Sequence, residues 1–210
     1  MIYDVVVIGG GPSGATAANE LASLNRKVAF IDKEGRIKPC GGAVPPRLIK
    51  DFDIPESQIV AKITTARMIS PTARKVDIPI ENGYVGMVDR ENFDEFLRTR
   101  AKAAGAHRFT GTFLKVLRKS GENFVAVVFK EKNSLKEITL KTKLIIGADG
   151  ARSNVARAEV PGGKTIPYVI AYHEIIEAPK NSQYDPDRCD VIYNGTISPD
   201  FYGWIFPHGK

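Results

Sequence analysis

Three glycines near the amino terminus have the spacing of a dinucleotide-binding turn. Gly9, Gly11 and Gly14 form the pattern G-x-G-x-x-G between a β-branched run and an alanine-rich segment. In such a turn the first glycine allows a tight bend, the second lets backbone N–H groups approach a pyrophosphate, and the third lets helix and strand pack closely. The anion then lies at the positive end of the following helix. We predict that these glycines, with Ser13 inside the turn, bind the phosphates of a dinucleotide.

An acidic residue follows where a nucleotide sugar would need one. Asp32 ends the next apolar run, 18 residues after Gly14, and its carboxylate can accept hydrogen bonds from a ribose hydroxyl. Because a carboxylate repels the 2′-phosphate of NADP, we expect FAD or NAD at this site. Lys33 comes next and is included among the cofactor-binding residues. The alternative is a turn of this type without a ligand, for which these glycines would have no packing rationale.

The elements that must hold these residues are predicted from periodicity. Residues 3–8 are a β-branched run of the kind buried on both faces of a parallel sheet, residues 12–24 a helix, and residues 28–32 a second strand. Asp89 is a suitable N-cap for a helix that runs to about residue 104. Residues 35–57 are predicted to be mostly loop. Further strands are expected at 63–70, 74–80, 84–88, 108–117, 124–130, 135–140, 143–147, 168–176, 191–193 and 202–206.

These elements predict an α/β fold. We expect a Rossmann-like FAD-binding domain with a parallel sheet, followed by an incomplete antiparallel β-sheet lobe. The FAD-binding domain is placed at residues 1–160, with a β-rich insertion around 60–88, and the start of a truncated substrate-binding lobe at 161–210.

Composition restricts the class of protein. With 210 residues, 43% hydrophobic and 26% charged, the chain resembles ordinary globular proteins. An apolar run long enough to span a membrane is absent from the sequence, so we expect a cytoplasmic protein and leave peripheral membrane contact open. Cys40 and Cys189 are expected to be reduced thiols, and the histidines lack metal-ligand spacing. The net charge of +6 is not accompanied by basic residues interleaved with aromatics, so nucleic acid is not an expected partner.

A second motif follows a later apolar strand and carries a family resemblance. Asp149, Gly150 and Ser153 match the pattern D-G-x-x-S-x-x-R, although the arginine stands one place late, at Arg157. This pattern resembles the second motif of the FAD-dependent hydroxylase and reductase superfamily. The resemblance implies that Asp149 meets a second part of the cofactor and that Arg90 occupies the place of a cofactor-contacting arginine. A surface charge at a helix terminus is the alternative interpretation of Arg90.

Four stretches resemble the geranylgeranyl reductase family, particularly its chlorophyll and bacteriochlorophyll branch. They are K-P-C-G-G at 38–42, D-F-D-I-P at 51–55, G-M-V at 86–88 and P-x-x-Y-x-W-x-F-P at 199–207. The resemblance implies that NADPH reduces FAD and that double bonds of a geranylgeranyl group on a pigment or other prenylated small molecule are then reduced. Cys40, Gly41 and Gly42 are included among the residues near the flavin. Because members of that family are much longer, we expect this chain to be an amino-terminal fragment.

The last stretch has a chemical rationale of its own. An unconjugated trisubstituted alkene has no carbonyl to stabilise an added hydride, so protonation toward a tertiary carbocation is the easier first step. If Tyr202, Trp204 and Phe206 alternate along a strand, their rings share one face and can stabilise that cation. An aromatic face packed in a sheet core is the alternative. Cys40 is predicted to position substrate or supply a proton, with a small buried hydrophobic residue as the alternative.

Two other functions stay open at this point. An aromatic-ring hydroxylase that uses oxygen would share the fold and both motifs. The chain could also be an incomplete, non-catalytic flavin-binding module, because the superfamily's third motif begins with a Gly-Asp pair that the sequence does not contain.

Overall fold

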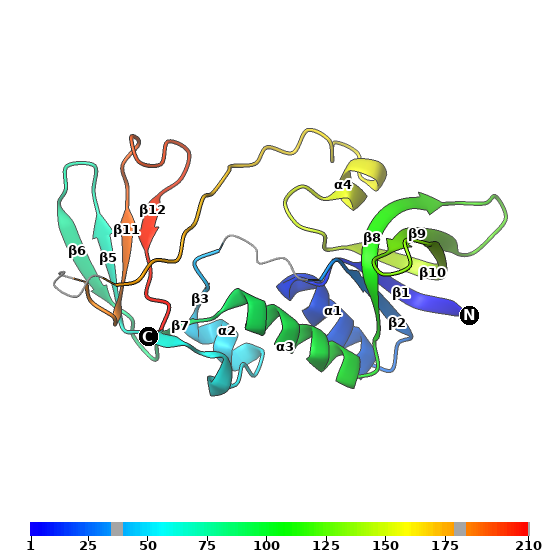
Figure 1. The fold of residues 1–210 in the computed structure, drawn as a ribbon, viewed down its shortest axis with the longest axis horizontal. Helices are drawn as coiled ribbons and strands as arrows, with labels where there is room; N and C mark the ends of the chain where they lie inside the picture. Colours follow the sequence, from blue (N-terminus) through cyan, green and yellow to red (C-terminus); the bar gives the residue numbers. More distant parts are fainter. Residues whose placement is uncertain (35–39, 179–183, 210) are drawn as a thin grey trace. The chain divides into compact units, whose positions relative to one another are not determined.

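The computed structural model describes residues 1–34, 40–178 and 184–209. By contacts the chain divides into two compact units, which Figure 1 shows in one view. The first comprises Met1–Arg36 and Asp94–Tyr168, and the second Ile37–Phe93 and Val169–Lys210. Lys38 and Pro39, which carry part of the family resemblance, lie outside the described residues. The domain boundary placed at residue 160 stays a prediction.

The first unit is built on a parallel sheet. Strand β1 (Ile2–Ile8) lies between β2 (Val28–Asp32) and β10 (Glu137–Gly147) and is parallel to both. Strand β8 (His107–Leu117) continues the parallel order, because its first residues pair with β2. This sheet confirms the predicted α/β fold, and it places the carboxyl ends of β1 and β2 side by side, where ligands bind in sheets of this class.

Three antiparallel strand segments cover the other side of this sheet. Strand β9 (Val125–Glu131) pairs with the later part of β8 and the earlier part of β10, so the five strands close on themselves. A register shift between Phe113 and Lys115 bends β8 between its two partners. Strand β10 is continuous where the sequence predicted two strands, and Leu144 in its last part is 56% exposed.

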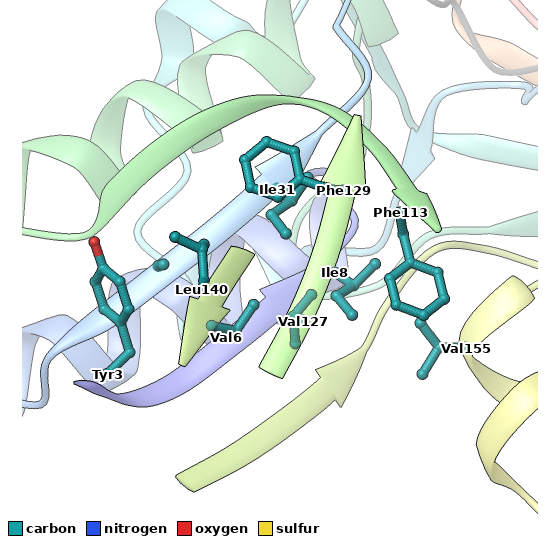
Figure 2. Close-up of a cluster of buried hydrophobic side chains, with 10 residues drawn as sticks. Tyr3, Val6, Ile8, Ile31, Phe113, Val127, Phe129, Leu140 and Val155 are labelled. Carbon is teal, nitrogen blue, oxygen red and sulfur yellow. The ribbon is translucent and has the colours of Figure 1, made fainter. Parts of the chain in front are cut away.

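The core of the first unit follows the period-two pattern of its central strands. Val6, Ile8 and Ile31 contact the antiparallel strands, in the cluster drawn in Figure 2. Their sequence neighbours Val5, Val7 and Phe30 pack with residues of the helices α1 (Pro12–Ser23) and α3 (Arg90–Ala103). Burial on both faces accounts for the continuous apolar run of β1. Each such side chain contributes about 1.5–3 kcal/mol when it is fully buried.

Helix α1 forms as the sequence predicts. Pro12 stands at its first position, where the missing N–H costs nothing, and small residues face the sheet at Gly14, Ala18 and Ala22. These small side chains let the helix lie close to β1 and β2. The helix ends before Asn25, which has a positive φ of 58°.

The described residues of the second unit form two small sheets. Strands β5 (Thr65–Ile69) and β6 (Lys75–Pro79), at the positions predicted for two strands, pair as an antiparallel hairpin. Strand β11 (Arg188–Ile192) is parallel to β5 and antiparallel to β12 (Gly203–Ile205), so this sheet is mixed rather than purely antiparallel. The other sheet consists of β3 (Ala43–Val44), β7 (Val85–Met87) and β4 (Ala61–Ile63).

Two expectations for the irregular segments were wrong. The predicted loop at 35–57 contains, within its described residues, β3, the helix α2 (Pro46–Asp51) and the single turn η1 (Glu56–Gln58). Pro45 and Pro55 immediately precede short helices, and Pro46 begins one. The strand expected at 168–176 has no regular structure, and no described strand pairs with it.

A further helix, α4 (Asn154–Glu159), follows β10. Among the described helices none is long and apolar enough to cross a membrane.

Candidate dinucleotide site and aromatic face

The turn after β1 leaves no room for a side chain at Gly9 or at Gly14. The Gly9 N–H donates to the Ile31 carbonyl at 2.9 Å, and the Ala148 N–H donates to the Ile8 carbonyl at 2.7 Å, so the turn is fixed to both neighbouring strands. Gly9 has a φ of +111°, and a Cβ there would lie 2.1 Å from the Ala148 oxygen. A Cβ at Gly14 would lie 1.9 Å from the Gly9 oxygen. Both predicted glycines are therefore required by backbone contacts.

Gly10 belongs to this turn and was not among the predicted site residues. A Cβ at Gly10 would lie 2.6 Å from the Cβ of Asp32. Only glycine therefore lets the turn lie directly against the acid at the end of β2. The sequence carried a signal for this, because Gly9, Gly10 and Gly11 are consecutive.

The amino terminus of α1 has the features of an anion site. Gly11 is the N-cap and provides no side-chain hydrogen bond to the first turn, and Pro12 follows it. Ser13 is exposed at this end of the helix. The dipole of a helix with twelve residues favours negative charge here. The turn and helix together fit a pyrophosphate.

Asp32 is buried in a network of charged groups. Its side chain is 8% exposed, and its Oδ2 lies 2.9 Å from Nε of Arg98 and 3.4 Å from a terminal nitrogen of Arg108. Both arginines also contact Glu95. Hydrogen bonds from both arginines hold the pKa of the Glu95 carboxyl below its ordinary value, and the bond from Arg108 has the larger effect. Lys33, next along the chain, is exposed.

Sequence reasoning missed both arginines of this network. Arg98 lies on the same stripe of α3 as Asp94 and Ala101, and all three are buried. The sequence did contain a signal for Arg98, because it is a charged residue at a position that the helical period assigns to the interior. Arg108, the second residue of β8, carried no comparable signal in the sequence.

Asp149 lies beside the glycine turn, with its carboxylate directed into its own segment. A Cβ at Gly9 would lie 2.8 Å from the Asp149 backbone nitrogen, so the second motif does meet the first. The Asp149 carboxylate accepts hydrogen bonds from the Asn154 N–H at 2.7 Å and from the Ser153 hydroxyl. The Ser153 hydroxyl in turn caps α4 through the Ala156 N–H. These bonds give the carboxylate a structural role, while its contact with a cofactor stays a prediction.

In the second unit the glycine pair after Cys40 packs against the aromatic motif. A Cβ at Gly41 would lie 2.6 Å from a ring carbon of Phe206 and 3.4 Å from the indole nitrogen of Trp204. Gly42 has a φ of +74°, and its carbonyl accepts the Val88 N–H at 2.9 Å. The segment is thus fixed beside β7, and the half-buried Cys40 lies next to Gly41.

The rings of the aromatic motif share one face of β12. The ring centroids of Tyr202 and Trp204 are 6.2 Å apart, and those of Trp204 and Phe206 are 6.5 Å apart. All three side chains are half-buried. Tyr193 and Phe201 extend this set, with centroids 6.2 Å and 4.0 Å from that of Tyr202. The predicted alternation is therefore present, and these two further rings are additions to it.

The predicted site residues thus gather in two sets, one in each unit. The glycine turn, Asp32 and the Asp149 backbone form the first set. The pair Gly41–Gly42 with Trp204 and Phe206 forms the second. Arg90, the first residue of α3, is half-buried in the second unit, and its predicted contact with a cofactor stays a prediction. Within the described residues no cluster of three or more His, Cys, Asp or Glu could hold a metal ion.

A model of the FAD-dependent oxidoreductase family matches residues 4–162, which include the glycine turn, Asp32 and Asp149. The chain belongs to this family. The match covers most of the chain and includes the glycine turn, in which Gly9 and Gly14 are required by contacts with neighbouring backbone atoms.

Relatives within the family match the chain over its whole length. Geranylgeranyl diphosphate reductase of Rhodobacter capsulatus is 63% identical over all of this chain and 53% of its own length. Digeranylgeranylglycerophospholipid reductase of Methanocaldococcus jannaschii is 31% identical over 100% of this chain and 54% of its own. A crystal structure of a geranylgeranyl bacteriochlorophyll reductase-like protein from Thermoplasma acidophilum has a TM-score of 0.77 at 27% identity, over 99% of this chain and 54% of that one. The chain therefore spans about half the length of these relatives, and the predicted resemblance is confirmed.

Proposed function

We propose that this chain is the FAD-binding part of a geranylgeranyl reductase, which saturates double bonds of a geranylgeranyl group. The observation that carries the proposal is the 63% identity, over the whole chain, with an enzyme named geranylgeranyl diphosphate reductase. Relatives from plants and archaea have names that contain the same prenyl group. The shared chemistry is therefore reduction of an isolated alkene, with a pigment, a diphosphate or a lipid as the carrier.

In this proposal the first unit binds the cofactor. The glycine turn and the amino terminus of α1 hold the pyrophosphate, and Asp32 holds the adenosine ribose. When bound, FAD supplies the hydride for the alkene, and NADPH is the reductant that the family resemblance assigns to it. Arg90 and Asp149 remain proposed contacts of the cofactor.

The second unit supplies the substrate face. Ring faces of Tyr202, Trp204 and Phe206 can stabilise positive charge that develops on the alkene, by about 0.5–2 kcal/mol each. Cys40, beside Gly41 and therefore near these rings, is the proposed group that positions the prenyl chain or donates a proton from Sγ. Peripheral contact with a membrane is the corresponding proposal for how a prenylated substrate reaches the protein.

The test is a product analysis on the full-length protein. Purified protein is supplied with NADPH and geranylgeranyl diphosphate, geranylgeranylated chlorophyll or geranylgeranylated glycerophospholipid under anaerobic conditions. We expect products heavier by one H₂ for each double bond reduced, with one NADPH consumed for each. No product without oxygen, and oxygen consumed in proportion to NADPH when the reaction is repeated in air, would show a hydroxylase instead. Protein that purifies without flavin and does not take up FAD would overturn the proposal.

A further inference from the structure

Arg98 joins three parts of the cofactor-binding unit through one buried guanidinium. Its side chain is 9% exposed, and a charge in such a place is costly unless it is paired. Nε donates to the Gly10 carbonyl at 2.7 Å and lies 2.9 Å from Oδ2 of Asp32. A terminal nitrogen donates to Glu95 at 3.1 Å. The arginine therefore connects α3 with the glycine turn and with the acid that ends β2.

The bond to Gly10 determines the orientation of a peptide unit in the turn. In a planar trans peptide the carbonyl oxygen and the following N–H point in opposite directions. Holding the Gly10 carbonyl toward Arg98 therefore directs the Gly11 N–H to the opposite side, away from Arg98. Gly11 is the N-cap of α1, the place where backbone N–H groups meet a phosphate in this type of turn.

The contact between Arg98 and Asp32 likewise orients the Asp32 carboxylate. Arg98 and Arg108 both contact Oδ2, so these two ion pairs do not occupy Oδ1. The side chain is also held close to the turn, since a Cβ at Gly10 would lie 3.0 Å from Oδ1. Asp32 is thereby fixed with one oxygen bound to the arginines and the other oxygen left to a further donor.

We propose that Arg98 is a positioning residue of the FAD site, which sets the Gly11 N–H for the pyrophosphate and Oδ1 of Asp32 for the adenosine ribose. The inference rests on the proposed FAD site and adds a specific device to it. Arg98 acts through Gly10 and Asp32, because its Nε contacts both the Gly10 carbonyl and the Asp32 carboxylate.

The test compares FAD binding with the binding of ADP and 2′-deoxy-ADP, two ligands that differ only in the hydroxyl that Asp32 would bind. Dissociation constants for FAD, ADP and 2′-deoxy-ADP are measured by calorimetry on full-length, flavin-free protein. The variants are Arg98→Met and, as a matched control, Arg108→Met, which removes a second arginine from Asp32 and Glu95 without touching Gly10. Arg98→Lys keeps the charge but cannot form the same fork of donors, and it is measured alongside in case the methionine variant does not fold.

We expect wild-type protein to bind ADP more tightly than 2′-deoxy-ADP. Arg98→Met should weaken FAD binding about ten- to a hundredfold, the loss of one charge-assisted hydrogen bond, and should abolish the preference for ADP. Arg98→Lys should lose part of that preference, whereas Arg108→Met should keep most of it. Equal weakening of both ADP ligands in the Arg98 variants, with the preference retained, would mean general structural support and would overturn the inference alone. Wild-type protein that binds no FAD would overturn the inference together with the proposed function.

Discussion

The two units differ in how completely they cover their own apolar side chains. In the first unit the central strands are buried on both faces, and Phe30 and Phe129 have no exposed surface. The second unit has a small buried cluster, Ile63, Met87 and Cys189, and it leaves large apolar residues exposed. Among these, Ile170 is 89%, Tyr172 80% and Ile176 74% exposed.

This difference indicates that the two candidate sites depend on different support. The residues of the glycine turn are fixed by backbone contacts and a buried ion network. The aromatic face is fixed by ring contacts on a half-exposed strand. Substitutions in the first unit should therefore lower stability and flavin binding together. Substitutions in the second should change substrate chemistry at little cost in stability.

The largest expected effect is on the core of the first unit. Phe129→Ala removes a ring with no exposed surface and should lower the free energy of unfolding by about 3–5 kcal/mol. Phe201→Ala, in the second unit, removes a ring that is 50% exposed, and the expected loss is below about 1 kcal/mol. Urea denaturation of the full-length variants measures both. Similar losses for the two would contradict the comparison.

The next effect concerns the turn. Gly14→Ala would place a Cβ 1.9 Å from the Gly9 oxygen, a backbone atom that cannot rotate away. We expect a loss of about 3 kcal/mol in the free energy of unfolding and protein that purifies without flavin. Gly195→Ala is the control, because nothing lies within 4 Å of its Cβ, and it should change stability by no more than about 0.5 kcal/mol. Full flavin content in Gly14→Ala would show that the turn tolerates the side chain.

The parts of this fold that could be predicted are those encoded locally. The β-branched run of β1, the small residues of α1 and the spacing from Gly9 to Asp32 lie within one short β-α-β unit. Their periodicities are properties of a single element, so they were visible without any partner. The alternation of the aromatic motif on β12 was predictable for the same reason.

What could not be predicted depends on partners far along the chain. The bond from Arg98 to Gly10 joins residues 88 positions apart, and no local pattern relates them. The expected strand at 168–176 had a suitable pattern but lacks a described neighbour to pair with. The mixed sheet is a further case, because the parallel pairing of β11 with β5 follows from tertiary structure rather than from either strand's sequence.

A smaller effect tests the aromatic face. Trp204→Ala should slow alkene reduction by an amount corresponding to about 0.5–2 kcal/mol, because one ring facing the developing cation is lost. Reduction of the flavin by NADPH should be nearly unchanged, as should the flavin content. Stopped-flow measurement of the two half-reactions separates these rates. Equal slowing of both would contradict a role for Trp204 in substrate chemistry.

The smallest effect distinguishes the two thiols of the second unit. Burial raises the pKa of the Cys189 thiol to about 12, because the thiolate would lose its hydration among Ile63 and Met87. Near pH 8 a maleimide should therefore modify the half-buried Cys40 first and reach Cys189 only on unfolding. In Cys40→Ser protein the fast modification should be absent.

The folded state disfavours the Cys189 thiolate. The contribution of the buried Cys189 thiol to the free energy of unfolding should therefore be present below the ordinary thiol pKa, about 8.5, and decrease as the pH rises toward 12. Rapid modification of Cys189 in native protein would show that even the small buried cluster of the second unit opens readily, and the contrast between the units would then be larger than the exposed surfaces indicate.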